Sequence, residues 1–389
     1  MRIGLDINRA RGYGRAFCEG VASWVDVRED WRLEMVDVSG PRTALAGLDG
    51  LIAHVVDDRT QKRLARLGIP AVADFYRAAQ RGFAQVMPDH AAIGALACDH
   101  FRERGFTRFA YCGYDGVLFS DARRDGFRAA LRRQCAGDLL EYHSPPDAYA
   151  KFGDQVIRRE QLAPDAVDAA ALAAWLRTLP PACAVFCAHD LRALQVVALA
   201  QDAGRSVPRD IAVLGVDNDA LVCSFAAPRL SSIDNNAFGC GRAAAQCLDD
   251  LIAGRADADE VRRVAPRGVV ARQSTEIFRY PSPAVNDAIL FMRRNLARNL
   301  TAAEVFDHVG RTHTYLDELF TREVGRTVHG EIGRLRLAEA KRLLATTALP
   351  LGDIAARSGF SSARYFTAVF KAAEGVTPTD WRLQNFPAG

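Results

Sequence analysis

The sequence predicts two parts of different fold class: a two-lobed α/β domain over residues 1–278 and an all-α domain over residues 284–389. Three observations lead to this prediction. Short apolar runs alternate with amphipathic stretches through the first 280 residues. The segment RYPSP at 279–283 ends this alternation, and its two prolines make it a short, stiff connector. Two copies of a helix-turn-helix pattern follow.

Eight apolar runs in the first part are expected to be strands: Arg2–Ile7, Leu33–Val38, Gly50–Val55, Ala71–Asp74, Phe109–Gly113, Leu139–His143, Ala184–Ala188 and Ile211–Val216. Helices are expected between them, at Gly14–Val25, Ile93–Arg104, Gly126–Arg133 and Leu191–Ala203. Such alternation predicts parallel sheets covered by helices on both faces. Eight strands over this length indicate two lobes rather than one sheet.

Polar residues recur where the predicted strands end: Asn8, Tyr13, Arg15, Asp89, Arg123, Asp190 and Asp217. Open α/β sheets bind ligands at the carboxyl ends of their strands, so two facing lobes would bring these side chains to one cleft. Carboxylates and arginines can form paired hydrogen bonds with vicinal hydroxyls, which predicts a small polyol or sugar as ligand. Taken singly, each residue also fits a helix cap or a solvated surface position.

The clearest motif lies at 351–383. Leu351–Ser358 is expected to be a first helix, Gly359 supplies the turn, and Ser361 or Ser362 caps a second helix. That second helix would bury Phe366, Val369 and Phe370 and expose Ser362, Arg364, Tyr365, Thr367 and Lys371. Donors, acceptors and a cation on one face suit an element that enters the major groove of DNA.

A second copy precedes it. Ala302–Val309 is the expected first helix, with Gly310 as its turn and Thr312 as the cap of the next helix. This helix would bury Leu316, Leu319 and Phe320 and expose Thr312, His313, Thr314, Asp317 and Glu318. The periodic segment Ile332–Leu344 is expected to join both copies as one helix. This helix would hold the two DNA-binding copies, here called the first reader (the upstream copy) and the second reader (the copy at 351–383), about one DNA turn apart. The alternative is a pair of helical hairpins in an ordinary bundle.

Composition excludes several other classes of protein. The net charge is +3, and residues 282–389, with 14 basic and 11 acidic side chains, carry this excess. Nine cysteines occur without a CxxC pair, which indicates buried free thiols and no metal site. Gly12 and Gly14 do not complete a GxGxxG, so a dinucleotide cofactor is not expected. We see neither a signal peptide nor an apolar run long enough to span a membrane, and expect a cytoplasmic protein.

The tail, over about 284–384, resembles the AraC family of bacterial transcription regulators. The resemblance rests on DIAARSGFSSARYFTAVFK followed by GVTPTDWR. It implies double-stranded promoter DNA as a partner, transcriptional activation, and contact with RNA polymerase. In the first copy, Phe306 stands where the family often has Ala, and Asp317 and Glu318 stand where many members have donors.

The first part resembles the sugar-sensing core of the LacI/GalR repressors over about 2–275, through RRDGFRAAL and the block from CAHDLRAL to VLGVDNDALV. This implies a type I periplasmic-binding-protein-like fold and ligand contacts at Asp89, Arg123 and Asp217. His189–Asp190 replaces the usual Asn–Asp. The chain differs from these repressors because it starts directly in the first predicted sensor strand.

A sugar sensor joined to an AraC-type tail resembles the family of xylose operon regulators, and Asn8, Tyr13 and Arg15 fit that family's first segment. This implies D-xylose as effector and a homodimer on paired half-sites. Other monosaccharides stay open. So do two other classes: an enzyme with a Rossmann-like core, in which Asp190 and Asp217 act as acid and base, and a sugar-binding module with a protein-interaction tail. The enzyme lacks support, because no nucleotide loop, metal constellation or nucleophile motif occurs.

Overall fold

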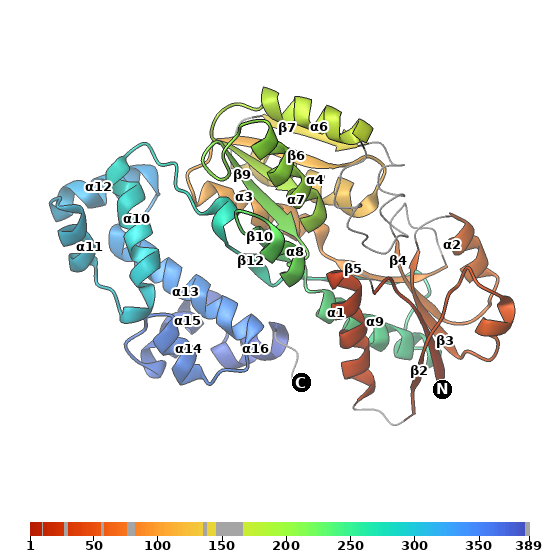
Figure 1. Cartoon of the computed structure of the whole chain (residues 1–389). Coiled ribbons are helices and arrows are strands. Elements are labelled where there is room, and N and C mark those ends of the chain that lie inside the picture. Colours follow the sequence, from red (N-terminus) through yellow and green to blue (C-terminus); the bar gives the residue numbers. More distant parts are fainter. Residues whose placement is uncertain are drawn as a thin grey trace. The chain divides into compact units, whose positions relative to one another are not determined.

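The computed structural model describes residues 1–9, 11–26, 30–55, 58–75, 82–134, 138–144 and 166–385 (Figure 1). The chain forms two compact units. The first contains Met1–His100 and Thr107–Glu276, and the second contains Phe101–Phe106 and Ile277–Gly389. The short segment Phe101–Phe106 therefore packs with the C-terminal unit, which the composition of the sequence did not indicate.

The first lobe of the first unit is built on a parallel sheet in the order β11-β5-β4-β3-β1-β2. Its strands are β1 (Arg2–Asp6), β2 (Arg32–Met35), β3 (Gly50–Val55), β4 (Ala71–Phe75), β5 (Ala84–Pro88) and β11 (Val261–Val264). The helices α1 (Gly12–Val25), α2 (Asp58–Ala65) and α9 (Ala237–Ile252) belong to this lobe. Ile3, Leu5, Ile52 and Val72 are fully buried in its core because both faces of the sheet are covered.

Helices α1 and α9 approach each other closely through two glycines. A Cβ atom on Gly20 would lie 2.0 Å from the carbonyl oxygen of Phe238, and one on Gly241 would lie 1.9 Å from that of Phe17. Any larger residue would push the helices apart. Because α1 starts next to the carboxyl end of β1, this contact fixes where the first turn of α1 lies.

The second lobe is built on a sheet in the order β12-β10-β9-β8-β6-β7. Its strands are β6 (Arg108–Tyr114), β7 (Leu139–Ser144), β8 (Cys183–Cys187), β9 (Ile211–Val216), β10 (Ser231–Asp234) and β12 (Gly268–Val270). Its helices are α4 (Leu118–Arg133), α6 (Ala166–Thr178), α7 (Asp190–Asp202) and α8 (Ala220–Phe225). Helix α3 (His90–Arg102) packs on α4 through Gly94. The chain passes between the lobes after β5, after β10 and after β11.

All eight predicted strands are present, with ends shifted by at most three residues. Four strands were not predicted: β5, β10, β11 and β12. Strand β10 (SSID) escaped because its buried residues include Ser231 and Ser232, whose hydroxyls are satisfied by Thr275 and Asp190 rather than by water. The expectation of purely parallel sheets is wrong at one edge, because β12 runs antiparallel to β10.

The second unit is helical and holds two helix-turn-helix pairs. Its helices are α10 (Pro283–Asn295), α11 (Ala302–Val309), α12 (His313–Glu323), α13 (Val328–Thr346), α14 (Leu351–Arg357), α15 (Ala363–Glu374) and α16 (Pro378–Asn385). The turns contain Gly310 and Gly359, whose φ angles of 65° and 77° confirm the predicted left-handed residues. No helix in the described part of the chain is long and apolar enough to cross a membrane.

The helix caps agree with the sequence in one reader and differ in the other. Ser362 accepts a hydrogen bond from the amide of Tyr365, as a cap of α15 should. Thr312 occupies the N-cap position of α12, but its hydroxyl makes no capping bond, so the predicted cap is wrong in its chemistry. The linking helix α13 contains the predicted Ile332–Leu344 and continues to Val328 and Thr346.

Candidate ligand cleft and nucleic-acid interface

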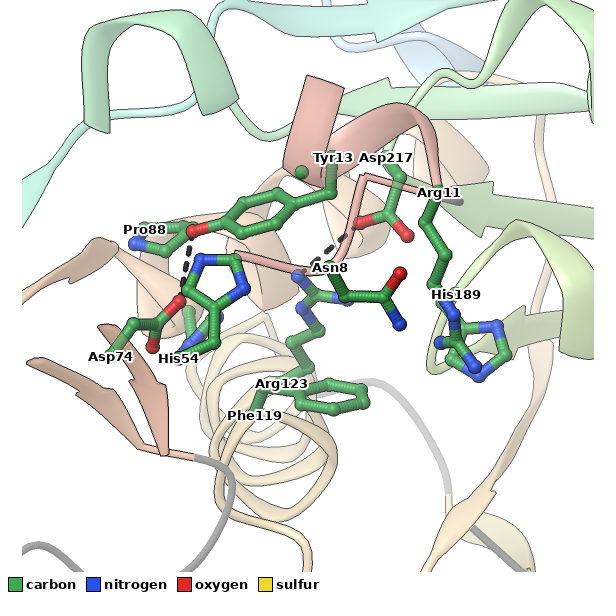
Figure 2. Close-up of a pocket in the computed structure, with 12 residues that line it drawn as sticks. Asn8, Arg11, Tyr13, His54, Asp74, Pro88, Phe119, Arg123, His189 and Asp217 are labelled. Atoms are coloured by element: carbon green, nitrogen blue, oxygen red, sulfur yellow. Dashed lines mark hydrogen bonds and ion pairs between the residues drawn. The ribbon is translucent and has the colours of Figure 1, made fainter. Parts of the chain in front are cut away.

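A cleft of about 570 Å³ lies between the two lobes of the first unit, at the carboxyl ends of both sheets (Figure 2). Its lining comes from both lobes: Asn8, Arg11, Tyr13, Gly14, His54, Asp74, Pro88, His90, Phe119, Arg123, His189 and Asp217. The walls combine two arginines with two aspartates, so they offer both hydrogen-bond donors and acceptors.

On the wall of the first lobe, a tyrosine and a carboxyl group are paired. The Tyr13 hydroxyl donates to Oδ2 of Asp74 across 3.0 Å, and the Tyr13 ring lies 5.5 Å from that of His54 (Figure 2). Burial raises the pKa of Asp74 to about 7, although the Tyr13 hydroxyl opposes this rise. Asp74 can therefore either donate or accept a hydrogen bond near neutral pH.

On the wall of the second lobe, Arg123 is the central cation (Figure 2). It is only 3% exposed, its Nη2 lies 3.8 Å from Oδ1 of Asp217, and its Nη1 donates to the carbonyl of Ala188. Its guanidinium carbon lies 5.0 Å from the centre of the Phe119 ring. Burial raises the pKa of Asp217 to about 6, with Arg123 opposing. The guanidinium is thus held in place before any ligand binds.

Three histidines complete the walls. Burial lowers the pKa of His54 to about 4, and it lowers the pKa of His90 and of His189 well below the usual value. All three rings are neutral at physiological pH, and a neutral imidazole has one donor and one acceptor. Nδ1 of His189 accepts from the amide of Arg192 at 3.1 Å. This mixture is suited to hydroxyl groups, which both donate and accept.

The structure brings four of the seven predicted ligand residues together in the cleft: Asn8, Tyr13, Arg123 and Asp217. Arg15, Asp89 and Asp190 are not among its lining residues. Asp89 accepts from the amide of Ala92 at the start of α3. Arg15 lies 3.6 Å from the carboxylate of Asp219.

Asp190 is 2% exposed and accepts from the Ser232 hydroxyl at 2.6 Å and from the Asp219 amide at 2.9 Å. It also lines a smaller cavity of about 320 Å³, which shares Arg11, Tyr13, His189 and Asp217 with the main cleft. Asp190 therefore supports the cleft wall from behind.

Sequence reasoning missed seven residues that line the cleft: Arg11, Gly14, His54, Asp74, Pro88, His90 and Phe119. It noted His189 only as a replacement. His54 and Asp74 lie within the predicted strands themselves, near their carboxyl ends, and were read as strand residues. A search for polar side chains in the last two positions of each strand would have found both.

The second helix-turn-helix exposes most of its predicted face. Ser362, Arg364, Tyr365 and Lys371 are exposed on α15, with Tyr365 at 49%. Thr367 is half-buried and its hydroxyl donates to the carbonyl of Ala363. Phe366 and Phe370 are fully buried on the opposite face, so the orientation of the helix is fixed by its core contacts.

The first helix-turn-helix differs from its prediction at several positions. Thr312, His313, Thr314 and Glu318 are exposed, but the His313 ring stacks on Phe306 with 4.1 Å between centres. Asp317 is half-buried and accepts from the amide of Val328 at 2.8 Å, so it caps the linking helix α13.

Tyr315, which the sequence reading did not single out, is 49% exposed at the position equivalent to Tyr365. Arg311 lies with its guanidinium carbon 6.0 Å from the Tyr315 ring.

The two readers are joined by contacts as well as by α13. Arg336 of α13 donates to the carbonyl of Leu300 at 2.8 Å and lies 6.0 Å from the ring of Phe360 in the second turn. A Cβ atom on Gly359 would lie 1.9 Å from the carbonyl oxygen of Leu296, so the second turn touches the segment before the first reader. These contacts set the spacing of the readers.

Thiols and possible metal ligands offer no other site among the described residues. No group of three or more His, Cys, Asp and Glu in this part of the chain is arranged to hold a metal ion. Eight cysteines are described; all are free thiols, and seven of them are buried. Burial raises the pKa of Cys183 to about 12 and that of Cys187 well above its usual value, which makes both unreactive at neutral pH.

Comparison with known proteins matches each unit separately and the chain as a whole. A family model for a periplasmic binding protein-like domain matches residues 98–275, and one for a helix-turn-helix domain matches 305–384. The xylose operon regulatory protein of Escherichia coli K12 is 29% identical over 403 residues, covering 99% of this chain and 97% of the relative.

Two further matches cover the tail and the fold. The HTH-type transcriptional activator AarP of Providencia stuartii is 31% identical over 106 residues, covering 27% of this chain and 78% of the relative. The solved structure of the xylose-binding transcription activator xylR is 27% identical with a TM-score of 0.59, and the match covers 99% of this chain and 98% of that chain.

Proposed function

Because the chain belongs to the DNA-binding transcription regulators that join a periplasmic-binding-protein-like sugar sensor to an AraC-type helix-turn-helix domain, we propose that it activates pentose catabolic genes in response to D-xylose. It is a regulator and not an enzyme. One observation carries the proposal: a cleft lined by both hydrogen-bond donors and acceptors occurs in the same chain as two helix-turn-helix readers.

The choice of D-xylose rests on two supports. The relatives that match over the full length are named for xylose. The cleft has an amide, two arginines, two aspartates and three neutral histidines, which suit the several hydroxyls of a pentopyranose. We propose Asn8, Tyr13, Arg123 and Asp217 as direct contacts, together with His54, Asp74, His90 and His189. Arg15, Asp89 and Asp190 are proposed to position these groups.

DNA is proposed to be read by both helix-turn-helix units. Ser362, Arg364, Tyr365, Thr367 and Lys371 form the proposed surface of the second reader. The predicted surface of the first reader consists of Thr312, His313, Thr314, Asp317 and Glu318. Of these, Thr312, Thr314 and Glu318 are exposed, and we propose them as its DNA-contacting residues. We take Arg364 as the first choice for base readout, because arginine bonds guanine edges through two parallel hydrogen bonds.

The mechanism links cleft closure to DNA binding in a homodimer. An effector that contacts both lobes stabilises the closed cleft by its higher affinity for that state. We propose that closure changes how two C-terminal domains meet paired half-sites, and that the bound dimer recruits RNA polymerase in the cytoplasm. The functional domains are proposed to be 1–278 and 284–389, joined by residues 279–283.

Calorimetry tests which sugar is the effector, and a duplex-binding assay tests whether that sugar changes the affinity for DNA. The full-length protein is titrated with D-xylose, L-arabinose, D-ribose and D-lyxose, and its affinity for upstream DNA of its own operon is measured with and without the best binder. D-xylose is expected to give the largest affinity and to change DNA affinity at least several-fold. A clear heat from another sugar with none from D-xylose overturns the effector, and turnover of any bound sugar would favour an enzyme.

A further inference from the structure

Asp219 joins the two lobes of the sensor next to the cleft. It follows β9 of the second lobe and is the N-cap of α8, where its Oδ1 accepts from the amides of Leu221 at 3.0 Å and Val222 at 3.4 Å. Its other oxygen, Oδ2, accepts from the amide of Gly12 at 2.9 Å. Gly12 is the first residue of α1 in the first lobe. One carboxylate therefore bonds backbone amides in both lobes.

The first-lobe side of this contact is shaped for a carboxylate. Arg15, one turn into α1, places its Nη2 3.6 Å from the same oxygen. The first amides of a helix carry partial positive charge, which favours an anion there. A Cβ atom on Gly12 would lie 2.5 Å from Oδ2 of Asp219, so only glycine lets the carboxylate come this close. The charge of Arg15, the partial positive charge of the helix N-terminus and the absence of a side chain on Gly12 all favour the hydrogen bond from the Gly12 amide to Asp219.

The second-lobe side is braced by other polar groups. The amide of Asp219 donates to the buried carboxyl of Asp190 at 2.9 Å, and Arg272 donates to Oδ1 of Asn218 at 2.7 Å. Asp217 has a φ angle of 111°, which a residue with a side chain adopts only when its surroundings hold it, and Asn218 follows in the left-handed region with a φ of 52°. The turn that presents Asp219 is thus fixed in a costly conformation, as expected where geometry matters.

We propose that Asp219 is a positioning residue, a latch that holds the two lobes together at the rim of the cleft and so sets effector affinity without lining the main cleft. Gly12 lies between Arg11 and Tyr13, which both line the cleft, so the bond to Asp219 also fixes this part of its wall. Loss of the latch shifts the sensor towards its open form. The affinity of an effector that needs the closed form then falls in proportion to the fraction of the protein that is closed. This inference rests on the proposed effector cleft.

The variant Asp219→Ser tests the latch, because serine still caps α8 but is too short to reach Gly12. The matched control is Asp210→Ser, since Asp210 accepts from the amide of Ser206 within the second lobe alone. Binding of D-xylose is followed by calorimetry and stopped flow on the full chain. Inter-lobe distance is measured without sugar by pulsed electron paramagnetic resonance, with labels on noncanonical amino acids at exposed Lys62 and Asp202.

Asp219→Ser is expected to weaken binding roughly tenfold, mostly through faster dissociation, since one charge-assisted hydrogen bond commonly contributes that factor. The sugar-free distance distribution should move to longer values. Asp210→Ser should stay within twofold of the wild type in both measurements. Gly12→Ala breaks the same bond from the other lobe, so Asp219→Ser combined with Gly12→Ala should be no weaker than the weaker single variant.

The latch would be overturned if Asp219→Ser kept the inter-lobe distances and the D-xylose affinity of the wild type. It would also be overturned if the losses of affinity in Asp219→Ser and Gly12→Ala added fully in the double variant. If Asp219→Ser does not fold, as judged by its thermal transition, Gly12→Ala alone decides by the same two measurements, because Gly12 lies outside α8. If the wild-type protein binds none of the pentoses, the proposed effector is wrong. The inter-lobe distances measured without sugar still test the latch in that case, because they do not depend on the effector.

Discussion

The hydroxyl of Tyr13 donates to Oδ2 of Asp74 at 3.0 Å, although the two residues are 61 positions apart and belong to a helix and a strand. The pair occupies one wall of the cleft (Figure 2). Its carboxyl group is partly buried and its pKa is raised to about 7, so this wall changes its hydrogen-bonding character near neutral pH.

The first prediction concerns pH and Asp74. In the unfolded chain its pKa is near 3.8, and in the folded protein it is about 7. Between these values the folded state holds more protons, so this group's contribution to stability is greatest below pH 4 and is lost as pH rises to 7.

Asp74→Asn should therefore flatten the pH dependence of the unfolding free energy between pH 4 and 7, by about 1–2 kcal/mol after allowance for solvent in the cleft. Chemical denaturation at several pH values measures this. Asp210→Asn, at a half-buried carboxyl outside the cleft in the same unit, is the control and should leave the wild-type slope, and a parallel shift in Asp74→Asn at every pH would contradict the assignment.

The second prediction concerns base readout by Arg364, which is exposed on α15. Arg364→Ala should cost about 1–3 kcal/mol on the operator and relax the preference at one base pair. Binding to operator and to random duplex, each at two salt concentrations, separates the alternatives. Equal losses on both duplexes would mean that Arg364 contacts phosphate only.

The third prediction concerns Asp317 in the first reader. Because its carboxylate accepts from the amide of Val328, Asp317→Ala should lower the unfolding free energy of the second unit by about 1 kcal/mol, as the loss of a helix cap does. Its DNA sequence preference should stay unchanged. Glu318→Gln is the comparison, since Glu318 is exposed one residue further along. Altered base preference in Asp317→Ala at unchanged stability would restore a DNA contact.

The fourth prediction uses two glycines with the same backbone conformation. Gly359 and Gly375 both have φ of 77°, but a Cβ atom on Gly359 would meet the carbonyl of Leu296 at 1.9 Å, whereas one on Gly375 would meet nothing within 4 Å. Gly375→Ala should cost about 1–2 kcal/mol from its backbone alone. Gly359→Ala should cost at least about 2 kcal/mol more, because the turn must move away.

Thermal and urea unfolding of both alanine variants give this difference. The same comparison tests the spacing of the readers. Of the two glycines, only Gly359 packs closely against the segment before the first reader, so only an alanine side chain at this position would push the second turn away from that segment. Gly359→Ala should therefore weaken binding to an operator with two major-groove contacts more than Gly375→Ala does. Equal unfolding free energies would mean that Leu296 yields at no cost.

How far the sequence predicts this structure depends on whether a signal is local. The helix-turn-helix units could be recognised because Gly310, Gly359 and Ser362 act on neighbouring residues. Asn8 and Asp217 could be placed in a cleft because each follows a strand in the chain, and Arg123 because it lies near the start of the helix after a strand. His54 and Asp74 could not, since a polar residue inside an apolar run reveals its orientation only when the facing lobe is known.

The same reason explains the residues whose contacts differ from expectation. The period of α12 places Asp317 on its polar face, but nothing in the local sequence shows that Val328, eleven positions later, presents an amide there. Strand β10 was missed because its serines look solvated until the buried partners Asp190 and Thr275 are brought to them. Long-range partners were the missing information in both cases.

The bond from the Arg192 amide to Nδ1 of His189 has a chemical consequence for effector recognition. Since Nδ1 accepts, the neutral imidazole must carry its hydrogen on Nε2, and the ring is restricted to a single tautomer. Asparagine at this position would present both an oxygen and an NH₂ group, whereas this imidazole can only donate. In the proposed contact with His189, the oxygen of the effector must offer a lone pair. An O-methyl ether there would still be accepted on electronic grounds, and a deoxy sugar lacking that oxygen would not.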